Sequence, residues 1–384
     1  MSQQLKFKGT ALFNGRQLLP GSMVLILSDK GIVQDIVHES AAGSDVQQFN
    51  GLLSPGFVNT HCHLELSHMG GVVPEKTGLP AFLTSVMEKR AQQDAASQVT
   101  AMQQAATAMW ESGVSAVGDI CNGTASLAFK KDSSLYYHSF IECMGFAPGF
   151  AQQRYDYSLD VLRQFRELNG PLHSCSIVPH APYSVSEALF SLLSATPDNT
   201  PVSIHNQECE AENNLYQDKT GAFLDFYRHF NMDATAFRET GTNSLPAWLP
   251  WFRQLPVLLV HNTYTTETDI AFTKEQAPQA YWCLCPQANL YIEDRLPDIA
   301  LLRSQGCTIT LGTDSLASNH QLSIWQEIQT IRKYYSNIAL EEILQWATLN
   351  GAIALGIQGR YGSFENGKQP GVILIDEKDS RRIL

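Results

Sequence analysis

The sequence predicts an α/β protein, a (β/α)8 TIM barrel with a small β-sandwich domain built from both termini. Short apolar segments alternate with segments of helical periodicity between residues 54 and 357. Several apolar segments are followed at once by histidine or aspartate. Because active sites of such barrels lie at the carboxyl ends of the strands, this placement supports the same fold.

The expected barrel strands are short, apolar and typical of strands buried on both faces. In chain order they cover residues 54–60, 114–120, 136–142, 174–179, 202–206, 256–262, 281–285 and 307–313. Helical periodicity falls between several of them, over residues 79–109, 157–168, 187–195, 267–275, 299–304 and 322–335. We expect residues 234–250, which contain Gly241, Pro246 and Pro250, to form a loop over the mouth of the barrel.

The two ends of the chain have a different character from the middle. Residues 5–13 and 22–27 are expected as short strands with turn residues such as Asn14-Gly15 near them. The tail repeats this pattern over residues 362–376. We therefore predict a small β domain of residues 1–53 plus 358–384, and a metal-dependent barrel of residues 54–357.

Composition restricts the classes of partner. An apolar fraction of 44% over 384 residues fits a globular protein with a sizeable core. The net charge of −12, dispersed along the chain, disfavours nucleic acid and anionic membranes. Neither a signal-peptide pattern nor an 18-residue apolar span is present, so we expect a cytoplasmic protein without a membrane partner. The eight cysteines contain no Cys-x-x-Cys, which argues against a thiolate zinc site.

The most informative motif is His61-Cys62-His63 at the end of the first barrel strand. Side chains of a strand alternate between its faces, so the two imidazoles leave on one face and Cys62 on the other. His205 and Asp314 also end apolar segments. We expect His61, His63, His205 and Asp314 to bind one divalent metal ion, Zn²⁺ or alternatively Fe²⁺. A second ion is not expected, because the segment before His180 supplies no bridging lysine.

Three further residues are candidates for catalysis and substrate binding. A bound divalent ion lowers the pKa of its water to about 7. Glu208, three residues beyond His205, is placed to move the proton of that water to the substrate. His261 ends the next strand and is expected to hold the hydroxide together with Asp314. His180 is a candidate for hydrogen bonding to a heterocycle nitrogen, although a structural loop histidine explains it equally well, and Glu208 has the alternative of a solvated loop carboxylate.

These segments resemble the amidohydrolase superfamily, in particular its aminohydrolase (deaminase) branch, over nearly the whole chain. The resemblance rests on residues 55–63, on His205-x-x-Glu208, on the lone His261, on residues 311–315 and on residues 362–368. It implies a mononuclear Zn²⁺ or Fe²⁺ hydrolase in which metal-bound hydroxide attacks a purine-type ring carbon and ammonia leaves. It also implies a homodimer and a small heterocyclic substrate.

Within that branch, residues 180–184 resemble the strand-four loop of deaminases of adenine-type nucleosides. Residues 63–67, 78–82 and 313–318 are similar to aminodeoxyfutalosine deaminases of the alternative menaquinone pathway. We therefore expect 6-amino-6-deoxyfutalosine or a related adenine nucleoside as substrate. Deaminases of guanine or other nucleobases and chlorohydrolase-type enzymes share the same motifs, so they stay open, and a non-catalytic scaffold is the remote alternative. Arg90, Arg154 and Arg295 are candidates for binding a substrate carboxylate.

Overall fold

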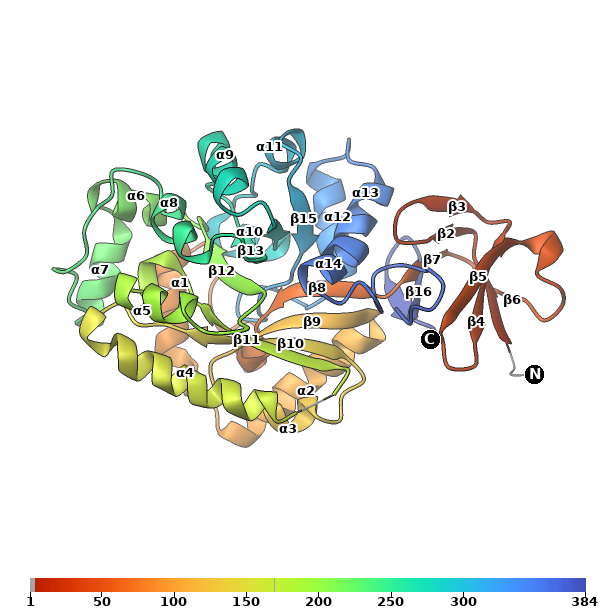
Figure 1. The fold of residues 1–384 in the computed structure, drawn as a ribbon, viewed down its shortest axis with the longest axis horizontal. Coiled ribbons are helices and arrows are strands. Elements are labelled where there is room, and N and C mark those ends of the chain that lie inside the picture. The colour runs from red at the N-terminus through yellow and green to blue at the C-terminus, as the bar shows by residue number, and fades with distance from the viewer. Residues whose placement is uncertain (1–3, 169) are drawn as a thin grey trace.

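Eight parallel strands form the (β/α)8 barrel of this protein, as a computed structural model of residues 4–168 and 170–384 shows (Figure 1). They form two four-stranded sheets, in the orders β11-β10-β9-β8 and β12-β13-β14-β15. Backbone hydrogen bonds join the sheets at both seams, from His205 N to His180 O (3.0 Å) and from Thr313 N to His61 O (3.0 Å). The strands are β8 (Phe57–Cys62), β9 (Val114–Cys121), β10 (Tyr136–Cys143), β11 (His173–Pro179), β12 (Val202–Asn206), β13 (Val257–His261), β14 (Ala280–Leu284) and β15 (Thr308–Leu311).

Helices surround the strands and alternate with most of them along the chain. They are α1 (Leu79–Lys89), α2 (Ala95–Glu111), α3 (Leu127–Lys130), α4 (Ala151–Arg166), α5 (Glu187–Ser194), α6 (Glu210–Asp218), α7 (Ala222–His229), α8 (Leu245–Trp248), α9 (Glu267–Gln276), α10 (Pro286–Glu293), α11 (Ile299–Ser304), α12 (Ile324–Tyr334), α13 (Leu340–Gln345) and α14 (Gly351–Ala354). The apolar side chains between strands and helices form one continuous core, while a second cluster, including Val58, Phe140, Val178 and Val260, fills the barrel interior.

Two expectations, one about a helix and one about a loop, were wrong in detail. The segment 79–109 forms two helices rather than one, because Asp94 caps the N-terminus of α2 by accepting a hydrogen bond from Ser97 N (3.0 Å). The segment 234–250 is not entirely loop, since α8 begins at Leu245. Pro246 lies in the first turn of α8, where a missing backbone N–H costs no helical hydrogen bond. That residues 234–250 cover the mouth of the barrel stays a prediction.

Strands from both ends of the chain form two small sheets beside the barrel (Figure 1). One sheet has the order β5-β4-β1-β6 and the other β17-β16-β7-β2-β3, and residues of both share one apolar cluster that includes Phe7, Leu25, Leu53 and Leu374. Their strands are β1 (Gln4–Lys8), β2 (Ala11–Phe13), β3 (Leu18–Pro20), β4 (Met23–Ser28), β5 (Val33–His38), β6 (Gln47–Gln48), β7 (Leu52–Pro55), β16 (Val372–Ile375) and β17 (Ser380–Arg382). The division into two domains at residues 53/54 and 357/358 stays a prediction, of which residues 1–3 lie outside the described chain.

The passage from the small sheet into the barrel takes place at Gly56. A Cβ atom on this residue would lie 1.9 Å from Ser115 Oγ and 2.7 Å from Pro370 O, so only glycine fits there. The close approach brings β7 and β8 into line and fixes where β8, which carries His61, enters the barrel. Among the described residues, none of the helices combines the length and the apolar character that crossing a membrane requires.

Candidate metal centre and active site

Five of the residues singled out in the sequence meet at the carboxyl end of the barrel. They come from the ends of β8, β12 and β13 and from the turn after β15, and all of them are buried: His61, His63, His205, His261 and Asp314. One donor atom from each of His61, His205, His261 and Asp314 lies within 4.8 Å of the others. Such convergence of side chains from distant segments is what the parallel barrel imposes on residues at its strand ends.

The spacing of the donor atoms fits a single ion. His63 Nε2 lies 3.1 Å from both His61 Nε2 and His205 Nε2. Asp314 Oδ1 lies 3.4 Å from His61 Nε2 and 3.3 Å from His63 Nε2. Ligands at the usual zinc distance in a tetrahedral arrangement are about 3.3 Å apart. The four residues expected as ligands therefore have the spacing that a divalent ion requires, and His261 lies beside them.

Contacts on the far side of the ligands orient them toward a common point. His205 Nδ1 donates to His180 O (2.8 Å), which leaves the lone pair of Nε2 facing the cluster. Asp314 Oδ2 accepts from Ser318 Oγ, so Oδ1 is the oxygen left for the centre. Imidazole nitrogens that face each other at hydrogen-bond distance, with carboxylate beside them, are the donor set of a cation site. The residues thus fit a divalent metal.

The backbone around the centre adopts conformations that non-glycine residues rarely take. Gln207, His261, Asn262 and Asp314 all have positive φ, at 47°, 75°, 60° and 56°. Left-handed backbone costs roughly 1–3 kcal/mol per residue and is concentrated at functional sites. Asn262 Nδ2 donates to Leu259 O (2.8 Å) and helps hold the bend that turns His261 into the barrel.

Burial sets the protonation states that metal binding needs. It lowers the pKa of His63 to about 3 and that of His261 to about 4, and it holds the pKa of His205 well below its usual range. Burial alone would raise the pKa of Asp314, but a hydrogen bond with His61 and the neighbouring imidazoles hold it well below its usual range. At neutral pH the centre accordingly offers neutral imidazoles at His63, His205 and His261 and an ionised carboxylate at Asp314.

Glu208 lies beside this centre and is not a solvated loop carboxylate. It is 3% exposed, whereas Glu210 is exposed. Its Oε1 lies 3.6 Å from His261 Nε2, and the other ring nitrogen of His261 contacts Asn289 Nδ2 at 3.2 Å. Burial, and next the charge of Asp314, hold the pKa of Glu208 well above its usual range. A buried carboxyl of raised pKa next to the reaction centre is suited to proton transfer near neutral pH.

His180 faces the centre from the neighbouring strand. Its Nδ1 contacts Ser184 Oγ at 2.6 Å, and its ring lies 4.9 Å from that of His205. The contact with Ser184 thus engages Nδ1 of His180 and leaves Nε2 as the other ring nitrogen. The three arginines that are candidates for binding a substrate carboxylate lie at least partly open to solvent. One of them, Arg295, lies over the ring of Tyr264 at 4.4 Å.

Sequence reasoning missed two carboxylates near the centre. Glu142, at the end of β10, lies beside His180 and His205, and its position at a strand end was the signal that could have found it. Asp119 of β9 accepts from Leu64 N (2.9 Å), directly after His63, and pairs with Lys130 Nζ at 2.5 Å. Both members of this ion pair are fully buried, so it fixes the chain behind His63.

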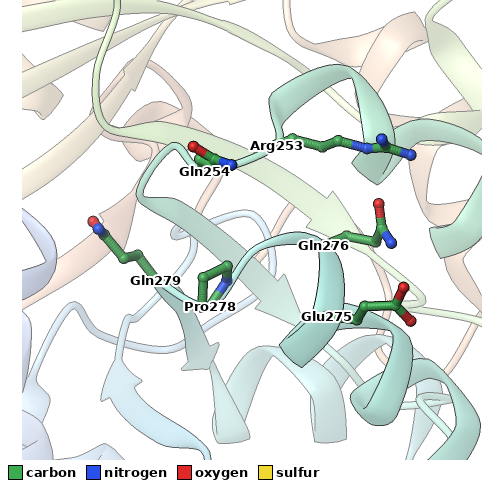
Figure 2. Close-up of a pocket in the computed structure, with 6 residues that line it drawn as sticks. All are labelled: Arg253, Gln254, Glu275, Gln276, Pro278 and Gln279. Carbon is green, nitrogen blue, oxygen red and sulfur yellow. The ribbon is translucent and has the colours of Figure 1, made fainter.

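The lining of a cavity of about 460 Å³ includes none of the residues of this centre (Figure 2). It is lined by Arg253, Gln254, Glu275, Gln276, Pro278 and Gln279. These residues precede β13 and β14, so the cavity opens at the amino ends of the strands, opposite His261. The barrel end that carries catalysis in this fold is the carboxyl end, and the cavity is therefore not the active site.

Glu212 ties down the loop that carries Glu208. Its Oε1 accepts from Gln207 N (2.9 Å) and from Ser244 Oγ, and burial raises its pKa from 4.5 to about 7. A raised folded-state pKa contributes stability in full below pH 4.5, and this contribution is lost as the pH rises through 7. We expect Glu212→Gln to raise the free energy of unfolding relative to wild type. This increase should be larger at about pH 8 than at about pH 5, by about 1–3 kcal/mol.

Urea unfolding at the two pH values measures this difference. Glu210→Gln is the matched control, because it makes the same chemical change on an exposed neighbour. A Glu212→Gln effect that is the same at both pH values would show that Glu212 does not titrate with folding.

Comparison with known proteins relates the chain to one family. The amidohydrolase family model matches residues 52–383. The chain is 26% identical over 350 residues to aminodeoxyfutalosine deaminase of a Nitratiruptor species, covering 90% of this chain and 84% of that protein.

Two solved structures show the same fold. Helicobacter pylori aminofutalosine deaminase in complex with methylthio-coformycin aligns with a TM-score of 0.84 at 22% identity, over 97% of this chain and 93% of that chain. An adenosine deaminase from Xanthomonas campestris with bound zinc aligns with a TM-score of 0.77 at 21% identity, over 97% and 85%. The barrel and the accompanying β-sheets are thus shared with enzymes of this fold.

Proposed function

Because the chain belongs to the amidohydrolase family, we propose that it is a metal-dependent hydrolytic deaminase of adenine-type nucleosides. Water replaces the exocyclic amino group of the purine ring, and ammonia leaves. The observation that carries this proposal is the convergence of His61, His63, His205 and Asp314, with Glu208 and His261 beside them, at one end of the barrel.

The donor set favours a borderline cation. Three imidazoles and one carboxylate suit Zn²⁺, with Fe²⁺ as the alternative. A structural neighbour carries bound zinc, which supports the same choice. When bound, such an ion lowers the pKa of a water molecule to about 7 and so supplies a nucleophile at neutral pH.

The protein residues provide proton transfer and orientation. Glu208 takes the proton of the attacking water and delivers it to a ring nitrogen, since its carboxyl is buried and has a raised pKa. His261 and Asp314 hold the attacking oxygen by hydrogen bonds. His261 Nε2 lies 3.6 Å from Glu208 Oε1, so it is beside the group that takes the proton. Nε2 of His180 bonds a ring nitrogen of the base and fixes which carbon is attacked.

Among adenine nucleosides we propose 6-amino-6-deoxyfutalosine as the preferred substrate. A relative at 26% identity is an aminodeoxyfutalosine deaminase, and the solved structure at TM-score 0.84 is an aminofutalosine deaminase. This choice would place the protein in menaquinone biosynthesis. The expected homodimer, the absence of a nucleic-acid partner and the cytoplasmic location stay predictions.

Product release from a substrate panel tests the proposal, measured as ammonia for the amino compounds and as chloride for the chlorotriazine. The panel contains aminodeoxyfutalosine, adenosine, methylthioadenosine, adenine, guanine and a chlorotriazine. We expect turnover of the nucleosides, fastest for aminodeoxyfutalosine. Turnover of the free bases or the chlorotriazine, with inert nucleosides, would replace the proposal by a nucleobase deaminase or chlorohydrolase. Faster turnover of adenosine than of aminodeoxyfutalosine would overturn only the choice of nucleoside.

A further inference from the structure

Glu142 is a buried carboxylate at the active-site end that the proposed chemistry does not use. It is the last residue but one of β10, and strand alternation places it on the face of Phe140. Phe140 belongs to the interior cluster with Val58, Val178 and Val260, so this face points into the barrel. The Glu142 carboxylate therefore enters the barrel from its carboxyl end, next to His180 and His205.

One carboxylate oxygen of Glu142 is satisfied and the other is not. Oε2 accepts from Asn122 Nδ2 (3.0 Å), and Asn122 is itself fixed by its backbone N–H to Glu65 Oε2 (2.9 Å). Oε1 is buried and has no hydrogen-bond partner among the described residues, and the residue is 6% exposed. A buried acceptor without a donor is costly, which indicates that a donor arrives from outside the protein.

The free oxygen is not part of a second metal site. His205 Nδ1 lies 3.8 Å from Oε1, but this nitrogen already donates to His180 O at 2.8 Å. Nε2 of His205 faces His63, in the metal centre. His205 thus has no nitrogen to offer a second ion, and Glu142 with His180 alone is too small a donor set.

We propose that Glu142 Oε1 accepts a hydrogen bond from a sugar hydroxyl of the bound nucleoside. A carboxylate only accepts, so its partner must be a donor, and the group attached to a purine base in a nucleoside is a sugar that carries hydroxyls. The negative charge also repels a phosphate, so the same residue selects nucleosides against nucleotides. This inference rests on the proposed function, because the nucleoside supplies the donor.

The test compares substrates that differ only in the hydroxyls. Values of kcat/KM are measured for adenosine and 2′,3′-dideoxyadenosine, and Kd for inosine and 2′,3′-dideoxyinosine. In the wild type, loss of the hydroxyls is expected to lower kcat/KM and weaken binding by about 10- to 100-fold, the usual effect of a hydrogen bond to a charged group. Two ratios between the substrate or product with hydroxyls and the one without are compared, one of kcat/KM and one of Kd. Glu142→Gln, which presents an amide donor where the acceptor was, is expected to reduce both ratios to about 3-fold or less.

The ratio on a single preparation is insensitive to the fraction of folded protein, so misfolding cannot imitate the expected result. Glu142→Asp, which keeps the charge but withdraws it by one methylene, provides a second variant and should lower the ratio in the same direction. Glu111→Gln is the matched control, because Glu111 is exposed and ends α2 just before β9, at the opposite end of the barrel.

Each outcome decides between the two proposals. Two results would overturn the role of Glu142 and leave the deaminase function standing. One is an equal loss of kcat/KM on both substrates in Glu142→Gln. The other is a wild type whose kcat/KM and Kd do not change when the hydroxyls are removed. A wild type that neither deaminates adenosine nor binds inosine would overturn both. Collapse of the ratio in Glu142→Gln, with the wild-type ratio kept in Glu111→Gln, supports the sugar contact.

Discussion

Replacing Glu208 by glutamine is expected to lower kcat by at least about 10²-fold without loss of metal. The amide has nearly the shape of the carboxyl group but cannot carry the proton that Glu208 moves. Glu208 is 3% exposed and its Oε1 faces His261, so the change removes an acid–base group without opening the site. The measurement combines steady-state turnover of an adenine nucleoside with the metal content of the purified variant.

The matched control for this substitution is Glu210→Gln, two residues further on and exposed. It is expected to keep wild-type turnover, because Glu210 points to solvent. A Glu208→Gln enzyme with near wild-type kcat would exclude Glu208 as the proton carrier. Loss of metal together with turnover would instead assign Glu208 to the ligand set.

Asp314→Asn is expected to weaken both metal binding and turnover. Asp314 is the one anionic member of the expected ligand set, and its Oδ1 lies within 3.4 Å of His61 Nε2 and His63 Nε2. Changes outside the ligands of a metal already cost about 10- to 100-fold in affinity, so removal of a ligand charge should cost more than about 100-fold. A metal titration against a chelator measures the affinity, and kcat at saturating metal measures the remaining activity.

Asp294→Asn supplies the control for the loss of a carboxylate. Asp294 is largely open to solvent and has a φ of 51°, a backbone conformation that asparagine also accepts readily. It should leave metal affinity and kcat unchanged. If Asp314→Asn kept wild-type metal affinity, Asp314 would not be a ligand, and the set would have to include His261 in its place.

The barrel could be predicted because its strands are apolar on both faces and therefore stand out from the amphipathic helices. Helix boundaries were harder, since helical periodicity continues through residues 79–109 while Asp94 starts a new helix at Ala95. Pro246 suggested a loop, yet proline is compatible with the first turn of α8. In both cases a single capping or first-turn position decides the boundary, and periodicity does not contain that information.

Residues of the candidate centre could be identified because one rule, the polar residue at a strand end, applies to His61, His205, His261 and Asp314 alike. The rule also applied to Glu142, which was overlooked because no histidine motif accompanies it. No sequence pattern predicted the Asp119–Lys130 ion pair. Its two members are separated by a turn, and only the folded chain brings Lys130 Nζ to the carboxylate. Contacts behind the ligands depend on packing that no local pattern encodes.

The central claim is that one metal ion in this barrel supports hydrolytic deamination of an adenine nucleoside. The most direct measurement is ammonia release from aminodeoxyfutalosine and adenosine by metal-free wild-type protein as Zn²⁺ is added back in known equivalents. We expect no turnover without metal and a linear rise that ends at one equivalent per chain. Turnover that is unchanged by removal of metal would contradict a mononuclear metal centre. So would turnover that continues to rise beyond one equivalent and ends at two. Absence of ammonia at full metal loading would contradict the deaminase itself.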